Sequence, residues 1–106
     1  MQTQINAPHE SLPDPLVDLI ERSVDEGLEH YATRLTQVII HIQDLNAHKG
    51  GIDKRCLIEA RPKGLDPLTA EHEDEEITDA FRGALDKLKR VLERRFGKLS
   101  SRKHEA

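Results

Sequence analysis

Two stretches of the chain carry apolar residues at helical spacing, three or four positions apart. The first begins near Asp14 and Pro15, and its spacing continues as far as Leu35. Asp14 is the predicted N-cap, because Pro15 then occupies the first helical position, where its missing N–H costs nothing. The second stretch begins at Ile77 after an acidic run, with Asp74 as the predicted N-cap. The pattern therefore predicts two amphipathic helices.

Four other stretches are predicted to be β-strands. Residues 37–45 and 52–61 alternate apolar and polar side chains with a period of two, and shorter strands are predicted at 2–7 and 68–72. Short loops join the last three strands, which should therefore form an antiparallel meander. The side chains expected on the buried face are Val38, Ile40, Ile42, Cys56, Ile58 and Ala60. The predicted fold class is α+β, in the order β-α-β-β-β-α, with one four-stranded sheet and two helices packed on one face.

The size of the chain and its cysteine usage narrow the class of protein. A chain of 106 residues suits one domain, which is predicted to cover residues 1–99, followed by a disordered polar tail at 100–106. Cys56 is the one cysteine and cannot form an internal disulfide, which favours a reducing compartment. No signal peptide is visible, and no apolar run approaches the ~20 residues that span a membrane. We therefore expect a cytoplasmic protein with no membrane partner.

Charge is distributed unevenly along the chain. Residues 1–76 hold 7 Lys/Arg and 16 Asp/Glu, a net charge of −9, whereas residues 77–106 hold 9 and 4, a net charge of +5. Such asymmetry indicates that the basic end meets an anionic partner. The overall charge of −4 argues against indiscriminate nucleic-acid binding by the whole surface.

The second helix carries the basic residues in a pattern. At 100° per residue, one stripe about 80° wide contains Lys87, Arg90, Arg94 and Lys98. The stripe is flanked by Arg82, Lys89 and Arg95. Such a stripe matches a polyphosphate backbone, where Arg and Lys displace condensed counterions. Two alternatives remain open: a solvated helix face that keeps the protein soluble, and a surface that docks on an acidic protein.

The chain contains several residue types that metals bind, but not at the spacing of a metal site. His41, His48, Cys56 and His72 include no pair arranged as C-x-x-C or H-x-x-x-H. Cys56 lies among apolar positions of a predicted strand, so we expect a buried thiol rather than a nucleophile. The acidic run 71–76 lacks the ligand pattern of a calcium loop and is explained by helix capping. We expect neither a cofactor nor enzymatic activity.

Residues 69–98 resemble a known family. The second helix matches a core of the form Ala-x-x-Gly-x-x-Asp-Lys-Leu, through Ala80, Gly83, Asp86, Lys87 and Leu88. The preceding Thr69-Ala70-Glu71 resembles the end of the family's fourth strand. Together with the element order, these motifs resemble the ribosome hibernation-promoting factor family, also called sigma-54 modulation or ribosomal subunit interface proteins, in its short form. The resemblance extends over about residues 1–99.

The resemblance implies a fold similar to double-stranded-RNA-binding domains and a non-enzymatic protein that responds to stress. Its expected partner is the 30S or 70S ribosome, where it would contact 16S ribosomal RNA in the channel for messenger and transfer RNA. Occupancy of that channel would inhibit translation and preserve idle ribosomes. No DNA partner is expected. The chain lacks the dimerisation domain of long family members, so it should be monomeric off the ribosome and should not dimerise ribosomes unaided.

The family's basic positions on the second helix match the four residues of the stripe, which are Lys87, Arg90, Arg94 and Lys98. The first helix is acidic where the family carries lysines, with only Arg22 and Arg34 nearby, so binding is expected to be weaker or aimed at a shifted site. The side chains that could compensate are His48, Lys49, Lys54, Arg55 and Arg61. The complete predicted RNA-binding set comprises Arg82, Lys87, Lys89, Arg90, Arg94 and Lys98 on the helix, and Lys49, Lys54, Arg55 and Arg61 outside it.

Overall fold

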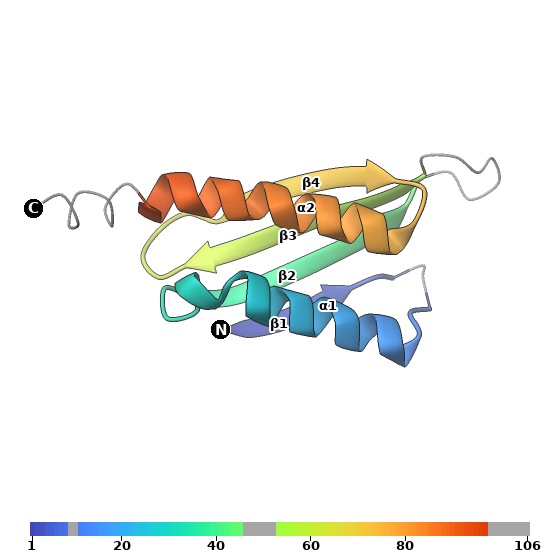
Figure 1. Ribbon diagram of the computed structural model, residues 1–106, viewed down its shortest axis with the longest axis horizontal. Helices are drawn as coiled ribbons and strands as arrows, with labels where there is room; N and C mark the ends of the chain where they lie inside the picture. Colours follow the sequence, from blue (N-terminus) through green and yellow to red (C-terminus); the bar gives the residue numbers. More distant parts are fainter. Residues whose placement is uncertain (9–10, 46–52, 98–106) are drawn as a thin grey trace, which may run out of the picture.

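The computed structural model describes residues 1–8, 11–45 and 53–97. Its elements are β1 (Gln2–Asn6), α1 (Asp14–Gly27), β2 (Leu35–Asp44), β3 (Lys54–Pro62), β4 (Leu68–Asp74) and α2 (Ile77–Leu92), shown in Figure 1. A 3-10 turn, η1 (Glu29–Tyr31), follows α1, and a π-helical turn, η2 (Glu93–Gly97), follows α2. The predicted polar tail lies outside the described residues.

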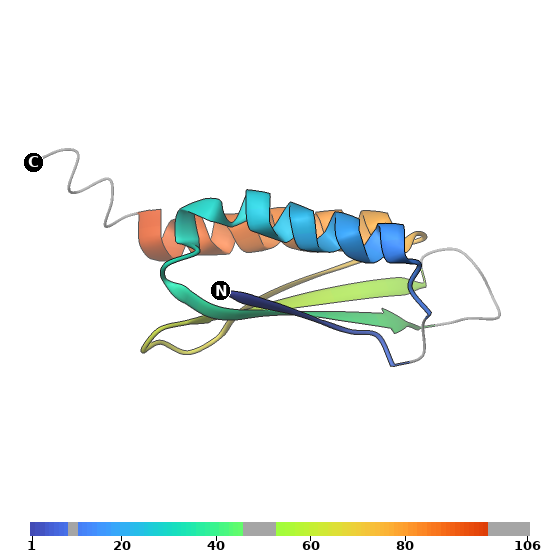
Figure 2. The same cartoon turned by 90° about the horizontal axis from the view of Figure 1, so that it is seen from below.

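The four strands form one mixed sheet in the order β1-β2-β3-β4. β2, β3 and β4 pair antiparallel, as the short loops predict, whereas β1 pairs parallel with β2. The parallel pair arises because α1 carries the chain back to the starting end of the sheet. Figure 2 shows both helices on one face of the sheet and none on the other. The predicted order and the two-layer α+β architecture are confirmed.

The core lies between that covered face and the two helices. The six strand side chains predicted to be buried are 0–3% exposed. α1 contributes Ile20 and Val24, and α2 contributes Phe81, Leu88 and Leu92, all fully buried. Burial of each such side chain stabilises the fold by about 1.5–3 kcal/mol. Because the core accounts for the apolar stripe of each helix, the opposite face of each helix is left to solvent.

Helix α1 is shorter than its apolar spacing predicts. It ends at Gly27, and the chain continues through η1 before Leu35 enters β2. Gly is a poor helix former, and the 3-10 turn keeps a period near three, so the apolar spacing persists after the α-helix has ended. The predicted N-cap was also wrong by one position. Pro13 is the N-cap, and its carbonyl accepts the N–H groups of Leu16 and Val17.

Helix α2 starts later than predicted. The predicted N-cap, Asp74, is instead the last residue of β4, and Glu76 is the N-cap. Asp74 Oδ1 accepts a hydrogen bond from the backbone N–H of Glu75 at 2.8 Å. Its carboxylate is therefore engaged at the end of the strand and does not cap the helix. The acidic run therefore belongs partly to an edge strand, which pairing with β3 extends beyond what its own sequence predicts.

Candidate nucleic-acid interface

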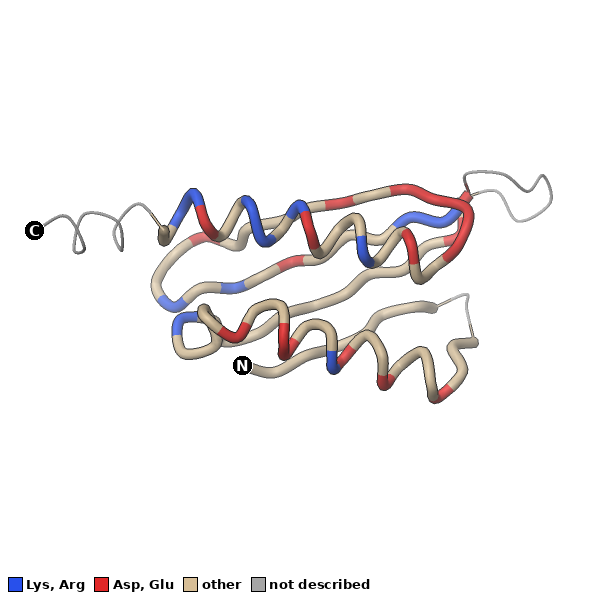
Figure 3. The backbone as a smooth tube through the Cα atoms, in the orientation of Figure 1, with Lys and Arg blue, Asp and Glu red and all other residues tan. Residues whose placement is uncertain are grey.

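The cations of α2 project from the helix away from the core. Arg82, Lys87, Arg90 and Arg94 are exposed, and Lys89 is half-buried. Figure 3 shows Lys and Arg concentrated in the C-terminal half of α2 and its following turn, whereas the charged residues of α1 are mostly Asp and Glu. The arrangement follows from the helical period, because the residues between the buried positions of α2 are predominantly basic there.

These α2 cations keep their charge. Within residues 1–8, 11–45 and 53–97, none of the ion pairs involves a Lys or Arg of α2 or η2. The Lys87 Nζ donates a hydrogen bond to the main-chain carbonyl oxygen of Glu71, 3.1 Å away, which is a neutral partner. The carboxylates of the acidic N-terminal part therefore leave this helix unneutralised, and its positive field is available to a partner.

The cations lie on two sides of α2. Lys87 reaches β4, which places the stripe of Lys87, Arg90 and Arg94 on the outer side of the helix, along the edge strand. Arg82 and Lys89 lie on the inner side, where they line a shallow groove between the helices with Ser23, Glu26, Gly27, Leu85 and Asp86. We call Lys87, Arg90 and Arg94 the outer stripe.

The predicted cations on the strands have a different environment. Lys54 Nζ lies 2.9 Å from Asp44 Oδ2, and Arg61 Nε lies 2.5 Å from Glu59 Oε2. Arg55 forms an ion pair with Glu71 across β3 and β4. Because each of these side chains has a carboxylate partner, its charge is partly neutralised and attracts phosphate less. Two further predicted residues, Lys49 and Lys98, lie outside the described residues.

A second group of cations gathers where α2 ends. The Lys63 N–H donates to the Arg34 carbonyl oxygen at 2.9 Å, and the Arg34 guanidinium carbon lies 5.0 Å from the ring centroid of Phe96. Phe96 shares the turn η2 with Arg94 and Arg95. We call Arg34, Lys63, Arg94 and Arg95 the basic end. Sequence reasoning missed it, because its members come from three separate segments and share no local pattern.

Charge is thus separated along the molecule. In Figure 3 the acidic residues cluster at the β4–α2 junction, at the opposite end from the basic end, and along α1. The exposed acids of α1 are Asp14, Asp18, Glu21, Asp25 and Glu26. A polyanion is therefore attracted to the outer stripe and the basic end and repelled by α1.

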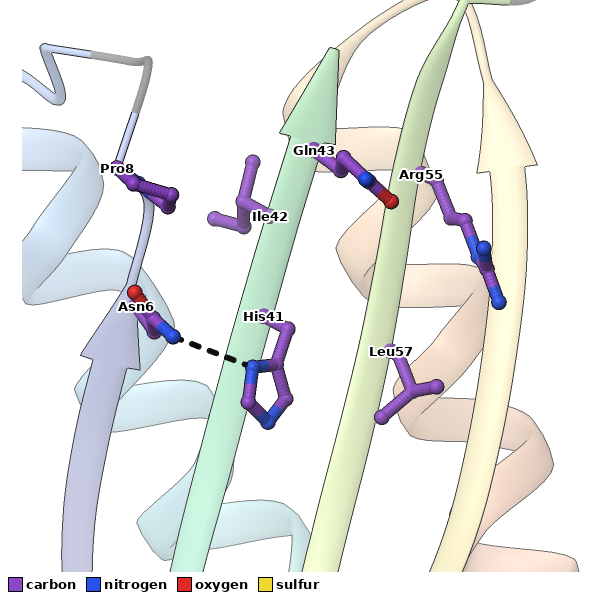
Figure 4. A pocket seen from close by; sticks show the side chains of 7 residues that line it. All are labelled: Asn6, Pro8, His41, Ile42, Gln43, Arg55 and Leu57. Atoms are coloured by element: carbon purple, nitrogen blue, oxygen red, sulfur yellow. Dashed lines mark hydrogen bonds between the residues drawn. The ribbon is translucent and has the colours of Figure 1, made fainter. Parts of the chain in front are cut away.

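The face of the sheet that no helix covers carries a shallow depression of about 360 Å³, drawn in Figure 4. It is lined by Asn6, Pro8, His41, Ile42, Gln43, Arg55 and Leu57. The Asn6 Nδ2 and the His41 Nδ1 are 3.5 Å apart, and Arg55 is engaged by Glu71. Among the described residues that line the depression, no nucleophile is paired with a base.

The Cys56 thiol and the candidate metal ligands are the other residues whose chemistry the structure tests. Cys56 is fully buried, and burial raises the pKa of its thiol from 9.0 to about 12. A thiol with that pKa is protonated at neutral pH and cannot act as a nucleophile.

Across the described residues, no three His, Cys, Asp or Glu side chains are grouped so as to hold a metal ion. In the same part of the chain, every helix is too short or too polar to cross a bilayer.

Two solved structures share this fold. The N-terminal domain of Protein Y from Thermus thermophilus superposes with a TM-score of 0.67 at 18% identity, covering 86% of this chain and 93% of that chain. A ribosomal subunit interface protein from Coxiella burnetii superposes with a TM-score of 0.67 at 17% identity, covering 92% of this chain and 99% of that chain. At these identities the similarity establishes the β-α-β-β-β-α fold.

Family membership is established by the sequence itself. A comparison with curated proteins finds no match. The model of the family described as "Sigma 54 modulation protein / S30EA ribosomal protein", however, matches residues 3–100, nearly the whole chain. The chain therefore belongs to the sigma-54 modulation / S30EA ribosomal protein family, a family of non-enzymatic, ribosome-associated regulators.

Proposed function

We propose that this protein inhibits translation by binding 16S ribosomal RNA of the small subunit, in the channel that messenger and transfer RNA use. The observation that carries the proposal is the outer stripe. Lys87, Arg90 and Arg94 are exposed on one side of α2 and, among the described residues, have no carboxylate partner. Membership of a ribosome-associated family supports the choice of partner.

The separation of charge supports a defined orientation on the RNA. Each Lys or Arg that neutralises a phosphate releases a condensed counterion, which favours binding. The acids of α1 oppose approach by that face, because like charges repel at close range. The outer stripe and the basic end therefore face the RNA, and α1 faces away from it. Inhibition follows from occupancy of the channel and needs no chemical step.

The cellular setting follows from this role. A cytoplasmic protein that occupies the messenger and transfer RNA channel of the 30S or 70S ribosome keeps idle ribosomes out of initiation during stress. The RNA target also accounts for the contrast between a basic helix and a net charge of −4, because only one surface needs to be attractive.

Charge reversal of the outer stripe tests the proposal. The triple variant Lys87→Glu/Arg90→Glu/Arg94→Glu should no longer co-sediment with 30S or 70S particles in sucrose gradients, because three attractive contacts become repulsive. The matched control compares single variants: Arg90→Glu should weaken co-sedimentation far more than Arg22→Glu, which acts only through long-range repulsion. Arg22 is also an exposed helical arginine, on α1, and its replacement by Glu changes the net charge by the same amount.

Two outcomes would overturn the proposal. Unchanged co-sedimentation of the triple variant, with native circular dichroism, would remove the outer stripe from ribosome binding. Capture of an acidic protein that survives nuclease treatment of the lysate, and that depends on the same three residues, would instead identify a protein-interaction regulator.

In a reconstituted system, the wild-type protein should inhibit initiation and the triple variant should not.

A further inference from the structure

A small pocket opens between the end of α1 and the end of α2. It has a volume of about 310 Å³ and is lined by His30, Tyr31, Arg34, Phe96 and Gly97. Neither the predicted RNA-binding set nor the outer stripe contains any of these residues. The pocket lies within the basic end, because Arg34 and the turn that contains Arg94 and Arg95 form part of its surroundings.

The walls of the pocket are two rings and a guanidinium group. The ring centroids of Tyr31 and Phe96 are 5.8 Å apart with an angle of 35° between the planes. The Arg34 guanidinium lies over the Phe96 ring, 5.0 Å from its centroid. Phe96 is only 7% exposed and therefore anchors the group, whereas Tyr31 and Arg34 are half-buried and His30 is exposed.

Backbone irregularities place these groups together. Tyr31 ends the 3-10 turn η1, and Phe96 lies in the π-helical turn η2. π-helical turns are rare and occur frequently at functional sites. Here the turn lets Phe96 pack beside Tyr31 while the two residues before it, Arg94 and Arg95, remain exposed. Aromatic surface and positive charge therefore meet at one place in the fold.

This combination suits an unstacked base of single-stranded RNA. Such bases bind by stacking on aromatic rings and on Arg guanidinium planes, and their edges form hydrogen bonds to nearby polar groups. Tyr31 and Arg34 provide the stacking surfaces, and His30 provides a ring nitrogen at the rim. Lys63, Arg94 and Arg95 carry charge for the flanking phosphates, and it exceeds that of the nearby acids Glu29 and Glu93.

We propose that the pocket formed by His30, Tyr31, Arg34 and Phe96 binds one unstacked nucleobase while the adjacent cations hold its phosphates. The inference rests on the proposed function and deepens it. The outer stripe would supply attraction that does not depend on base identity, and the pocket would select a single-stranded segment with an accessible base. Duplex RNA, whose bases are stacked and paired, would not fill it.

The protein carries its own reporter for this site. Tyr31 is the one tyrosine of the chain, and there is no tryptophan. Titration with a five-nucleotide adenylate RNA should therefore quench tyrosine fluorescence, because the base stacks against the emitting ring. An abasic ribose-phosphate oligomer of the same length carries the same phosphates and should bind without this quenching. Equal quenching by both oligomers, corrected for absorbance, would overturn the proposal.

Two variants separate stacking from charge. Arg34→Lys keeps the charge but loses the planar group, and His30→Ala removes an exposed rim contact without disturbing the buried rings. Alanine substitutions of stacking groups imply losses of roughly five- to 150-fold in affinity. We expect Arg34→Lys to weaken binding of labelled adenylate RNA at least fivefold, and His30→Ala to weaken it severalfold. Arg22→Lys, an exposed change on α1, is the matched control and should change nothing.

Ribosome co-sedimentation distinguishes the two proposals. If the triple variant of the outer stripe loses ribosomes while both pocket variants retain wild-type binding of adenylate RNA, the pocket inference fails and the proposed function stands. If the base-dependent quenching occurs and Arg34→Lys weakens it, the pocket inference stands, even where the triple variant still co-sediments with ribosomes and the proposed site is wrong.

Discussion

Gly83 lies where helix α2 passes directly over the ring of His72 on β4. A Cβ atom at this position would lie 2.2 Å from His72 Cδ2 and 2.4 Å from its Cγ, distances that real side chains do not tolerate. Gly83, the glycine of the Ala-x-x-Gly-x-x-Asp-Lys-Leu core, therefore has a packing role. It lets the helix that carries the outer stripe approach the edge strand, and the same approach puts Lys87 within reach of the Glu71 carbonyl oxygen.

We predict that Gly83→Ala lowers the free energy of unfolding by about 1–3 kcal/mol, because either the imidazole ring of His72 must rotate away from the helix or the helix must withdraw from β4. Urea unfolding followed by circular dichroism measures the change. Gly27→Ala is the matched control, since its Cβ would meet the mobile Cε of Lys89 at 2.8 Å. That variant should be neutral, or more stable by up to about 1 kcal/mol. Equal destabilisation by both substitutions would contradict the packing argument.

The buried thiol of Cys56 makes the free energy of unfolding depend on pH in the alkaline range. Burial raises the pKa of its thiol from 9.0 to about 12, so in this range the folded chain holds a proton that the unfolded chain releases. The stabilisation is complete below pH 9 and is lost as the pH rises from about 9 towards 12.

Relative to Cys56→Ala, the wild-type protein should therefore lose about 1.4 kcal/mol of unfolding free energy between pH 8 and pH 10. Urea unfolding of both proteins across this range measures the difference, and other titrating groups cancel because the two chains share them. The native thiol should also resist iodoacetamide at pH 8 until urea unfolds the chain. A constant difference between the two proteins, or rapid alkylation of native protein, would show that Cys56 is accessible.

At the scale of the elements, the two helices have opposite electrostatic roles despite similar packing. Both bury one apolar stripe against the same face of the sheet. α1 presents carboxylates on its exposed side, whereas α2 presents cations along its C-terminal half. The pair therefore gives a polyanion one attractive helix and one repulsive helix, which restricts how it can approach.

Neutralising part of the α1 surface should strengthen RNA binding. Glu21→Gln/Asp25→Asn removes two exposed negative charges, and charges on a protein surface repel a polyanion over about a Debye length. We expect about a two- to threefold gain in affinity for 30S particles at low salt, disappearing at high salt. Filter binding measures it. The charge-preserving variant Glu21→Asp/Asp25→Glu should behave as wild type, and a loss of affinity in the neutralised protein would place α1 in contact with the partner.

At the scale of the whole molecule, the salt dependence of binding reports how many phosphates the protein engages. The logarithm of the binding constant should fall linearly with the logarithm of salt concentration, with a slope of about 0.7–0.9 per phosphate contact. Lys87→Gln/Arg90→Gln/Arg94→Gln should therefore reduce the magnitude of the slope by about two to three. A slope unaffected by these substitutions would mean that phosphates are not the partners of the outer stripe.

Much of the architecture could be predicted because it depends on local chemistry. The alternation from Val38 to Ile42 predicted the buried face of β2, and the spacing from Ile77 to Leu92 predicted the buried face of α2. Element ends were less predictable. Gly27 ended α1 although the apolar spacing continued, and Asp74 joined β4 because strand pairing outweighed its preference for a helix N-cap.

The residues of the candidate nucleic-acid interface also differ in how far the sequence alone predicts them. Helical spacing alone predicted that Lys87, Arg90 and Arg94 share one side of α2. It could not predict the ion pair of Arg55 with Glu71, which lies on the neighbouring strand and is set by strand register. Arg61 pairs with Glu59 two residues earlier on the same strand, where alternation places both side chains on one face but does not show that they pair. The predicted RNA-binding set contains residues of both kinds. The structure separates those without an acidic partner from those already paired.

The sequence by itself therefore determined the layers, the buried faces and the basic character of the last helix, because periodicity and composition act through near neighbours along the chain. Only the tertiary structure decided which cations stay free of carboxylates, why Gly83 must be a glycine, and that His30, Tyr31, Arg34 and Phe96 form one pocket. Those properties depend on distances between residues far apart in the chain, which strand register and helix packing set and local patterns do not encode.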